Sequence, residues 1–168
     1  GHLIEGIETT VAYELRGEDG IAGEDTVYIY AGKKLLQKTI PTHAGKGTFT
    51  ILPQGNVKYH ATVKRGKKEH EFEFPAIEKE GVVIAVSDEQ QKVSIKVSNN
   101  LEASTALGCA ILHRGELSHY QSYDSENDGK IFTIDKDSLR EGVNRVFVFV
   151  NDKLPLAERQ FCVMHEKI

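Results

Sequence analysis

The stretch Asn144–Val163, NRVFVFVNDKLPLAERQFCV, predicts two β-strands joined by a turn. Three valines alternate with two phenylalanines over residues 146–150. Both faces of the first strand are therefore apolar, which is typical of a central strand covered on both sides. Asn, Asp and Lys at 151–153 favour a turn, and Pro155 fits the start of the second strand, where a missing N–H is tolerated. We interpret this stretch as the closing hairpin of a β-sandwich.

The rest of the chain repeats the pattern of short apolar runs separated by turn residues. Turn signals recur about every 8–12 residues, a spacing typical of sandwiches, and only residues 137–142 suggest a helical turn. The sequence therefore predicts an all-β chain of two tandem immunoglobulin-like antiparallel β-sandwiches. Strands are expected at 7–15, 27–30, 35–40, 48–52, 57–63, 69–74, 82–86, 92–98, 106–113, 117–123, 130–134, 144–150 and 156–163.

Residues 75–81, PAIEKEG, form the expected linker, because a proline ends one strand and a new apolar run begins at Val82. We expect a first domain over residues 1–76 and a second over residues 77–168. Such a short linker predicts limited hinge motion, which an apolar interface around Ile77 would remove.

The hairpin before the linker has a register that follows from its apolar residues. A turn centred on residues 65–66 places Tyr59 opposite Phe72. His70 then faces the core and His60 faces outward, so the two histidines are not expected to share a metal.

Composition narrows the function classes. The net charge is −4, and 39% of residues are hydrophobic. Neither half has the basic surplus expected for nucleic-acid or anionic-membrane binding, and no apolar run reaches the roughly 20 residues that span a bilayer. The basic cluster at residues 64–68, KRGKK, is interpreted as a solvated hairpin tip.

The two cysteines, Cys109 and Cys162, are expected on strands that flank a common neighbour. Two strand spacings separate such residues by about 9–10 Å, which exceeds the reach of a disulfide. We expect two buried free thiols, and the cysteines do not settle the cellular compartment.

The segment from Asp124 to Gly129, DSENDG, approximates a calcium loop whose twelfth position is Asp135. Glu126 is too long for the third position, Asp135 is short for a bidentate ligand, and the flanking segments are strands. We interpret the segment as a polar hairpin loop and retain Asp124, Glu126, Asp128 and Asp135 as calcium candidates.

Other chemical sites are weakly indicated. The acidic loop at 17–26 is interpreted as solvated, and the neighbouring Ser118 and His119 point to opposite faces of a strand, so they are not expected to act as a nucleophile and its base. Tyr120 and Tyr123 are the candidates for stacking on a sugar. We expect no enzymatic activity and no cofactor in this chain.

The segment from Gly142 to Val163 resembles the last two strands of macroglobulin-like domains in large bacterial cell-envelope proteins, which close with a glycine, a strand, a turn and PLAER. Residues 11–13, 46–50, 53–55 and 59–61 (VAY, KGTFT, PQG and YHA) are similar to the preceding domain of such proteins.

This resemblance implies a periplasmic or cell-surface location, associated with the outer membrane, within a longer multidomain chain. The implied partners are the other domains of that chain and a protein of the envelope. The thioester motif of protease-trapping macroglobulins is absent, so the resemblance does not imply that activity.

Two hypotheses of different classes follow. The first is a non-catalytic tandem of immunoglobulin-like modules that acts as a spacer and interaction region. The alternative is a calcium- or glycan-binding module that uses residues 124–135, and an enzyme fragment would need catalytic residues outside this chain.

Overall fold

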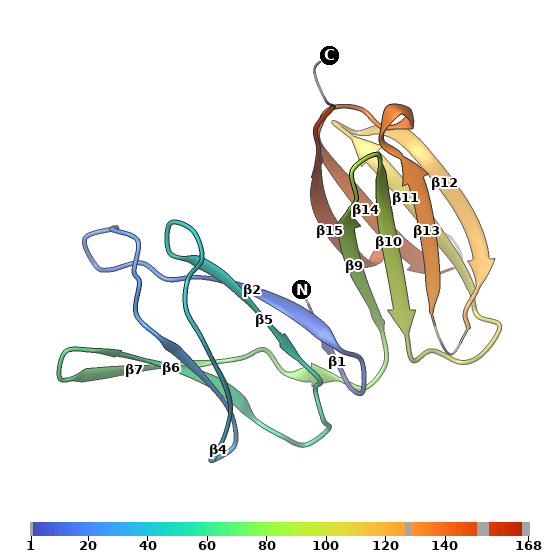
Figure 1. The fold of residues 1–168 in the computed structure, drawn as a ribbon. Coiled ribbons are helices and arrows are strands. Elements are labelled where there is room, and N and C mark those ends of the chain that lie inside the picture. The colour runs from blue at the N-terminus through green and yellow to red at the C-terminus, as the bar shows by residue number, and fades with distance from the viewer. Residues whose placement is uncertain (1, 127–128, 151–154, 166–168) are drawn as a thin grey trace.

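The structure, a computed structural model, describes residues 2–126, 129–150 and 155–165. Nearly all of its regular structure is β-strand, and the described helical part is the single 3-10 turn η1 (Lys136–Ser138). The strands form two antiparallel β-sandwiches that follow each other along the chain (Figure 1). The predicted all-β sandwich fold is confirmed.

The first sandwich packs a sheet of two strands against a sheet of four. The larger sheet has the order β4-β3-β6-β7. Because the smaller sheet is only two strands wide, it leaves part of the larger one uncovered, and every residue of β7 is exposed. The smaller sheet pairs β2 (Thr9–Glu14) with β5 (Lys46–Ile51), and the larger contains β4 (Lys34–Thr39), β3 (Val27–Ala31), β6 (Tyr59–Arg65) and β7 (Lys68–Glu73).

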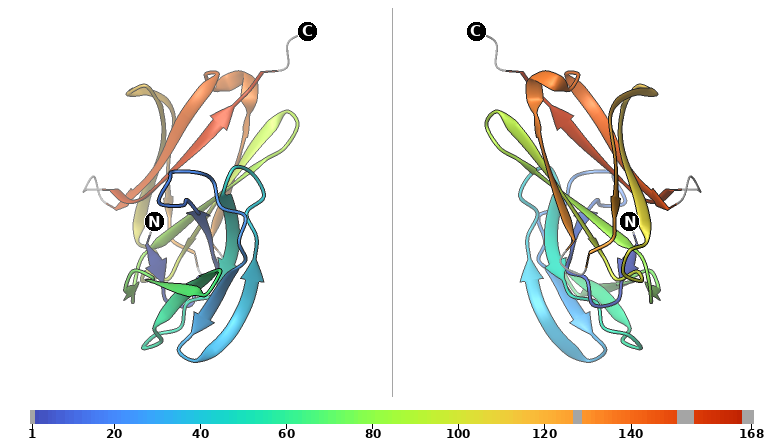
Figure 2. Two further views of the ribbon diagram at one scale, coloured as in Figure 1. Left: turned by 90° about the vertical axis from the view of Figure 1, so that its left-hand side faces the viewer. Right: turned by 90° about the vertical axis from the view of Figure 1, so that its right-hand side faces the viewer.

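The second sandwich has seven strands in the immunoglobulin-like arrangement of a three-stranded and a four-stranded sheet. Figure 2 shows it from two sides, above the first sandwich. The three-stranded sheet has the order β13 (Lys130–Asp135), β10 (Lys92–Asn99), β9 (Val82–Asp88). The four-stranded sheet has the order β12 (Glu116–Asp124), β11 (Ala106–His113), β14 (Gly142–Val150), β15 (Pro155–Val163).

Each sandwich has its own hydrophobic core, because alternate residues of its strands point inward. Ile29 lies at the centre of the first core, whose residues fall between Leu3 and Ile77. Ile95 and Ile111 lie in the second core, whose residues fall between Val82 and Val163. The expected domain boundary between residues 76 and 77 stays a prediction.

Strand β14 is a central strand, as expected, because it pairs with β11 on one side and β15 on the other. Val146 and Val148 are fully buried on its inner face. The expectation that both faces are covered is wrong, because Phe147 and Phe149 on the outer face are only half-buried. Phe149 is partly covered by the ring of Tyr120, whose centroid lies 6.2 Å away.

The hairpin of β6 and β7 has a register two residues away from the predicted one. Ala61 lies opposite Phe72, and the turn is centred on residues 66–67. Gly66 has a φ of 62° and occupies the first central position of the turn, where hairpins of this length place glycine. A shift by two preserves the faces, so His70 still lies on the inner side. It is nevertheless exposed, because it borders a cavity instead of packing into the core.

Two short strands that the sequence did not predict fasten the joint between the sandwiches. β1 (Leu3–Ile4) pairs in parallel with β8 (Ile77–Glu78) in the linker. Ile4 is 1% exposed, and a side chain at Gly81 would collide with it, since the added Cβ would lie 2.5 Å from its Cδ1. We call this pairing of β1 with β8 the clasp.

Asn100, which follows β10, extends the clasp to the second sandwich. Its side-chain amide donates to the carbonyl oxygens of Glu5 at 3.1 Å and Lys79 at 2.6 Å. Its Oδ1 accepts a hydrogen bond from the N–H of Gly81 at 2.8 Å. The side chain therefore connects the N-terminal segment, the linker and the second sandwich.

Next to the clasp, a hollow of about 860 Å³ lies between the two sandwiches, and Leu3 of β1 is among the residues that line it. Residues of β2, β9 and β15 line it, and the half-buried Arg159 is among them. Strands β2 and β9 also contact each other across the joint.

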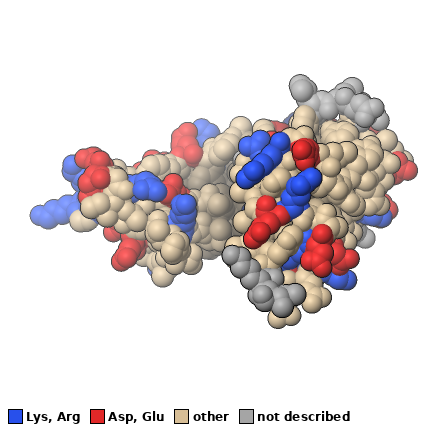
Figure 3. Space-filling view, turned by 90° about the horizontal axis from the view of Figure 1, so that it is seen from above, with Lys and Arg blue, Asp and Glu red and all other residues tan. Residues whose placement is uncertain are grey.

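Positive and negative side chains are intermixed on the surface seen from above (Figure 3). No helix in the described residues is long and apolar enough to cross a membrane.

Candidate binding surface on the first sandwich

Strand β7 is the last strand of its sheet, so one side of its backbone has no neighbouring strand in the described structure. The N–H of Phe74, just after β7, donates to the carbonyl of Tyr59 at 3.1 Å. Backbone groups alternate in direction along a strand. The N–H and C=O groups of Glu69, Glu71 and Glu73 therefore point away from β6, toward the free edge.

The same three glutamates place their side chains on the outer face of the sheet, and all three are exposed. No ion pair in the described part of the chain involves any of them. The free edge of β7 therefore combines unpaired backbone groups with a row of three negative charges.

The inner face of the hairpin borders a cavity of about 550 Å³. Val63 lines it from β6 and Phe72 from β7, and Phe72 is 54% exposed. Arg65, Lys68 and His70 lie on the same face nearer the hairpin tip. This side of the edge is thus apolar at Phe72 and basic toward the tip.

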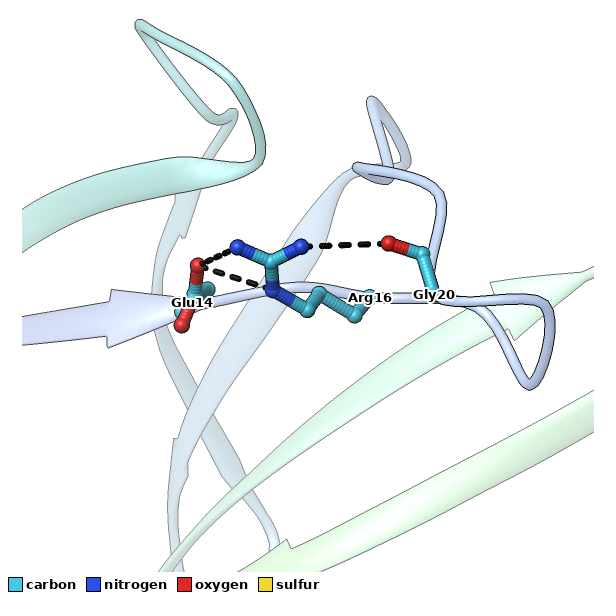
Figure 4. Close-up of polar contacts among 3 residues, drawn as sticks. All are labelled: Glu14, Arg16 and Gly20. Atoms are coloured by element: carbon cyan, nitrogen blue, oxygen red, sulfur yellow. Dashed lines mark hydrogen bonds and ion pairs between the residues drawn. The ribbon is translucent and has the colours of Figure 1, made fainter.

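The loop after β2 forms the opposite wall of the cavity. The side chain of Arg16 stabilises this loop by hydrogen bonds to Glu14 and Gly20 (Figure 4). Its guanidinium donates to Glu14 Oε1 at 2.9 and 2.6 Å and to the carbonyl of Gly20 at 3.1 Å. The hydrogen bonds from Arg16 lower the pKa of Glu14 below its usual value. The wall is therefore built by an arginine bridging a strand end and a loop.

A second arginine ties this loop to the hairpin. Arg65 Nε lies 3.4 Å from the carboxylate of Asp25, and a Cβ at Gly17 would lie 2.6 Å from its guanidinium. Asp19 accepts a hydrogen bond from the N–H of Ile21 at 3.0 Å. Two carboxylates of the acidic loop are thus engaged in holding the loop in place.

The calcium candidates do not all meet. Asp124 ends β12, and Glu126 lies 3.9 Å from Lys130 Nζ. Asp135 lies at the far end of β13 from this loop, and five strand steps from Lys130 correspond to about 16 Å. Asp128 lies outside the described residues. Among residues that are described, no three His, Cys, Asp or Glu side chains are grouped to hold a metal.

The tyrosine candidates for sugar stacking point in different directions. Tyr120 is 52% exposed on the outer face of its sheet, whereas Tyr123 packs edge-on against Phe132 at 5.2 Å. Burial raises the pKa of the Tyr123 hydroxyl. Ser118 and His119 are both half-buried, and His119 lies opposite Ile111 on the inner face.

Both cysteines are free thiols, as expected, and their strands flank β14. The expectation that both are buried is wrong for Cys162, which is exposed on the outer face of the edge strand β15. Cys109 is buried, and burial raises the pKa of its thiol to about 11.

Comparison with protein-family models gives no match to this chain. Comparison with curated proteins gives no match either. The functional argument therefore rests on the sequence and the geometry.

Sequence reasoning missed this surface because it counted Phe72 and His70 as core residues. The signal that was available is the strict alternation of KEHEFE over Lys68–Glu73, in which every second residue is Lys, His or Phe and the others are glutamate. A strand with charges on so many positions is typical of a sheet edge.

Proposed function

We propose that this chain is a non-catalytic pair of immunoglobulin-like modules that acts as a spacer and protein-interaction region within a larger bacterial envelope protein. The observation that carries this proposal is the clasp reinforced by Asn100. Domains in one chain move relative to each other unless their interface is substantial. Hydrogen bonds from one side chain to both the N-terminal segment and the linker suit a spacer of defined geometry.

The residues that carry the macroglobulin-like resemblance have architectural roles, which supports the proposal. Gly142 begins β14 with a φ of 102°, a conformation that favours glycine. Tyr59 accepts a hydrogen bond at its hydroxyl from the N–H of Gln54 at 2.9 Å, which fixes the turn before β6. Such roles explain why a scaffold would need these residue types without any catalytic demand.

The spacer role is tested by residual dipolar couplings measured on the whole chain. A fixed joint makes the two sandwiches share one alignment tensor within experimental error. Two clearly different tensors would show independent motion and would contradict a spacer of defined geometry.

The envelope location needs a separate test in cells. An antibody raised against this chain would be applied to periplasmic, membrane and cytoplasmic fractions of the source bacterium. We expect the parent protein in the periplasmic or membrane fraction, and its confinement to the cytoplasmic fraction would reject the location.

A further inference from the structure

We infer that the free edge of β7 is a docking site for an extended segment of a partner protein in which lysine or arginine alternates with apolar residues. The inference rests on the proposed interaction role and names the chemistry of the partner. It combines three observations: unpaired backbone groups, a row of glutamates, and the exposed side chain of Phe72 beside a cavity on the opposite face.

The backbone supplies the binding mode. Glu69, Glu71 and Glu73 point their N–H and C=O groups to the free side of β7, as the Phe74–Tyr59 hydrogen bond requires. An added strand about 4.8 Å away would pair with these groups and extend the sheet. Main-chain pairing of this kind provides affinity that depends little on sequence.

The side chains supply the selectivity. On the outer face, an added strand would place every second side chain beside the three exposed glutamates, which carry no ion pair within the described structure. Opposite charges on neighbouring strands stabilise the pair, and like charges destabilise it. Lysine or arginine is therefore favoured at the outward positions of the partner.

On the inner face, the alternate side chains of the partner would lie over Phe72 and the cavity of about 550 Å³. An apolar side chain there covers the 54% of Phe72 that is exposed and gains from leaving water. Both basic and acidic side chains line the cavity on this face, and Arg65 is paired with Asp25. The preference for a cationic partner therefore comes from the glutamates on the outer face.

A second copy of the chain is a poor occupant of the same edge. When two copies of β7 pair in antiparallel fashion within one continuous sheet, outer-face residues lie opposite outer-face residues. Glu71 would then face Glu71, or Glu69 would face Glu71, in the central registers. The glutamate row thus opposes self-association while leaving the edge open to a basic strand.

The test uses the whole 15N-labelled chain and a synthetic peptide of alternating lysine and valine with blocked ends. At a peptide concentration about ten times the Kd, amide exchange at Glu69, Glu71 and Glu73 should slow about tenfold, because only the free fraction exchanges. The amide of Phe72, which already faces β6, should change little. This alternation of protected and unchanged amides is the signature of an added strand.

Charge reversal at all three glutamates (E69K, E71K and E73K together) should raise the Kd of this peptide at least about tenfold. The same variant should gain affinity for a peptide of alternating glutamate and valine. The control variant reverses the exposed Glu102, Glu141 and Glu158, which changes the net charge equally and leaves β7 intact. It should bind the lysine peptide within about twofold of the original chain.

A further variant, Glu71→Pro, removes one outward N–H from an edge where proline is tolerated, and it should weaken binding without loss of folding. Uniform or absent protection along β7, or equal binding by both charge-reversed variants, would overturn the inference. So would a concentration-dependent dimer that protects the same three amides. If the peptide does not bind while the two sandwiches still share one alignment tensor, the docking site on β7 is rejected and the proposed spacer role is retained.

Discussion

Replacing Asn100 with alanine should loosen the joint without unfolding either sandwich. The change removes two hydrogen bonds donated to Glu5 and Lys79 and one accepted from Gly81. The backbone pairing of β1 with β8 remains, so the joint is weakened rather than abolished.

The expected loss follows from the surroundings of these bonds. Hydrogen bonds contribute about 0.5–1.5 kcal/mol each, and those near water fall at the low end. Asn100 is itself exposed and only its bond from Gly81 is partly buried, so we expect a total of about 1–2 kcal/mol. A loss of that size raises the open fraction of the joint roughly 5–30-fold.

The assay is hydrogen exchange at the amide of Glu5, which donates to the carbonyl of Glu78 at 2.9 Å across the clasp. Its exchange should accelerate by that factor, while amides in the core of β10 keep their rates. The control is Gln121→Ala, which removes an exposed amide side chain on β12, a strand that takes no part in the clasp. An unchanged rate at Glu5 in a folded Asn100→Ala chain would refute the role of this side chain in the joint.

Three further predictions concern the second sandwich. Val148→Ala should lower the free energy of unfolding by about 2 kcal/mol in urea titrations, because the side chain is fully buried. Val143→Ala, on the exposed face of the same strand, should stay within about 0.5 kcal/mol, and equal losses would contradict the assignment of faces. Ellman's reagent at pH 8 should modify Cys162 quickly and Cys109 only after unfolding, since burial keeps the Cys109 thiol protonated with a pKa of about 11; two fast thiols would oppose this. Millimolar calcium should leave the melting temperature unchanged, because Asp135 lies far along β13 from the loop at Asp124; a clear rise would revive the calcium hypothesis.

Strand positions could be predicted from sequence because alternation is a local property of each segment. Residues 106–113, for example, were expected as a strand and form β11 over the same range. The neighbours of β14 also followed from the order of strands in immunoglobulin-like sandwiches. Local pattern and a common topology were enough for this part of the fold.

Burial was harder to predict because it depends on what lies across the sandwich. Phe72 and Phe149 both occupy alternating apolar positions, yet Phe72 is 54% exposed and Phe149 is half-buried. The smaller sheet of the first sandwich does not extend over β7, and no sequence pattern states how wide a partner sheet will be. The candidate binding surface arises from this incomplete cover.

The clasp could not have been predicted by periodicity. Leu3 and Ile77 are 74 positions apart in sequence and belong to strands of two residues. Strands that short have no period, and only the folded first sandwich brings them together. The calcium pattern is also non-local: its twelfth residue, Asp135, lies at the end of an extended strand and does not return to the loop at Asp124.

The clasp also determines how the chain would carry mechanical tension. Force that enters at Leu3 can pass directly to Ile77 through the parallel pairing and continue into β9. The two short strands would be loaded in shear, since the pull acts on the start of one and the end of the other. The chain between β1 and β8 forms the first sandwich and both its ends lie at the clasp (Figure 1). The first sandwich therefore bears no tension while β1 and β8 stay paired, and it can present β7 to a partner in that state.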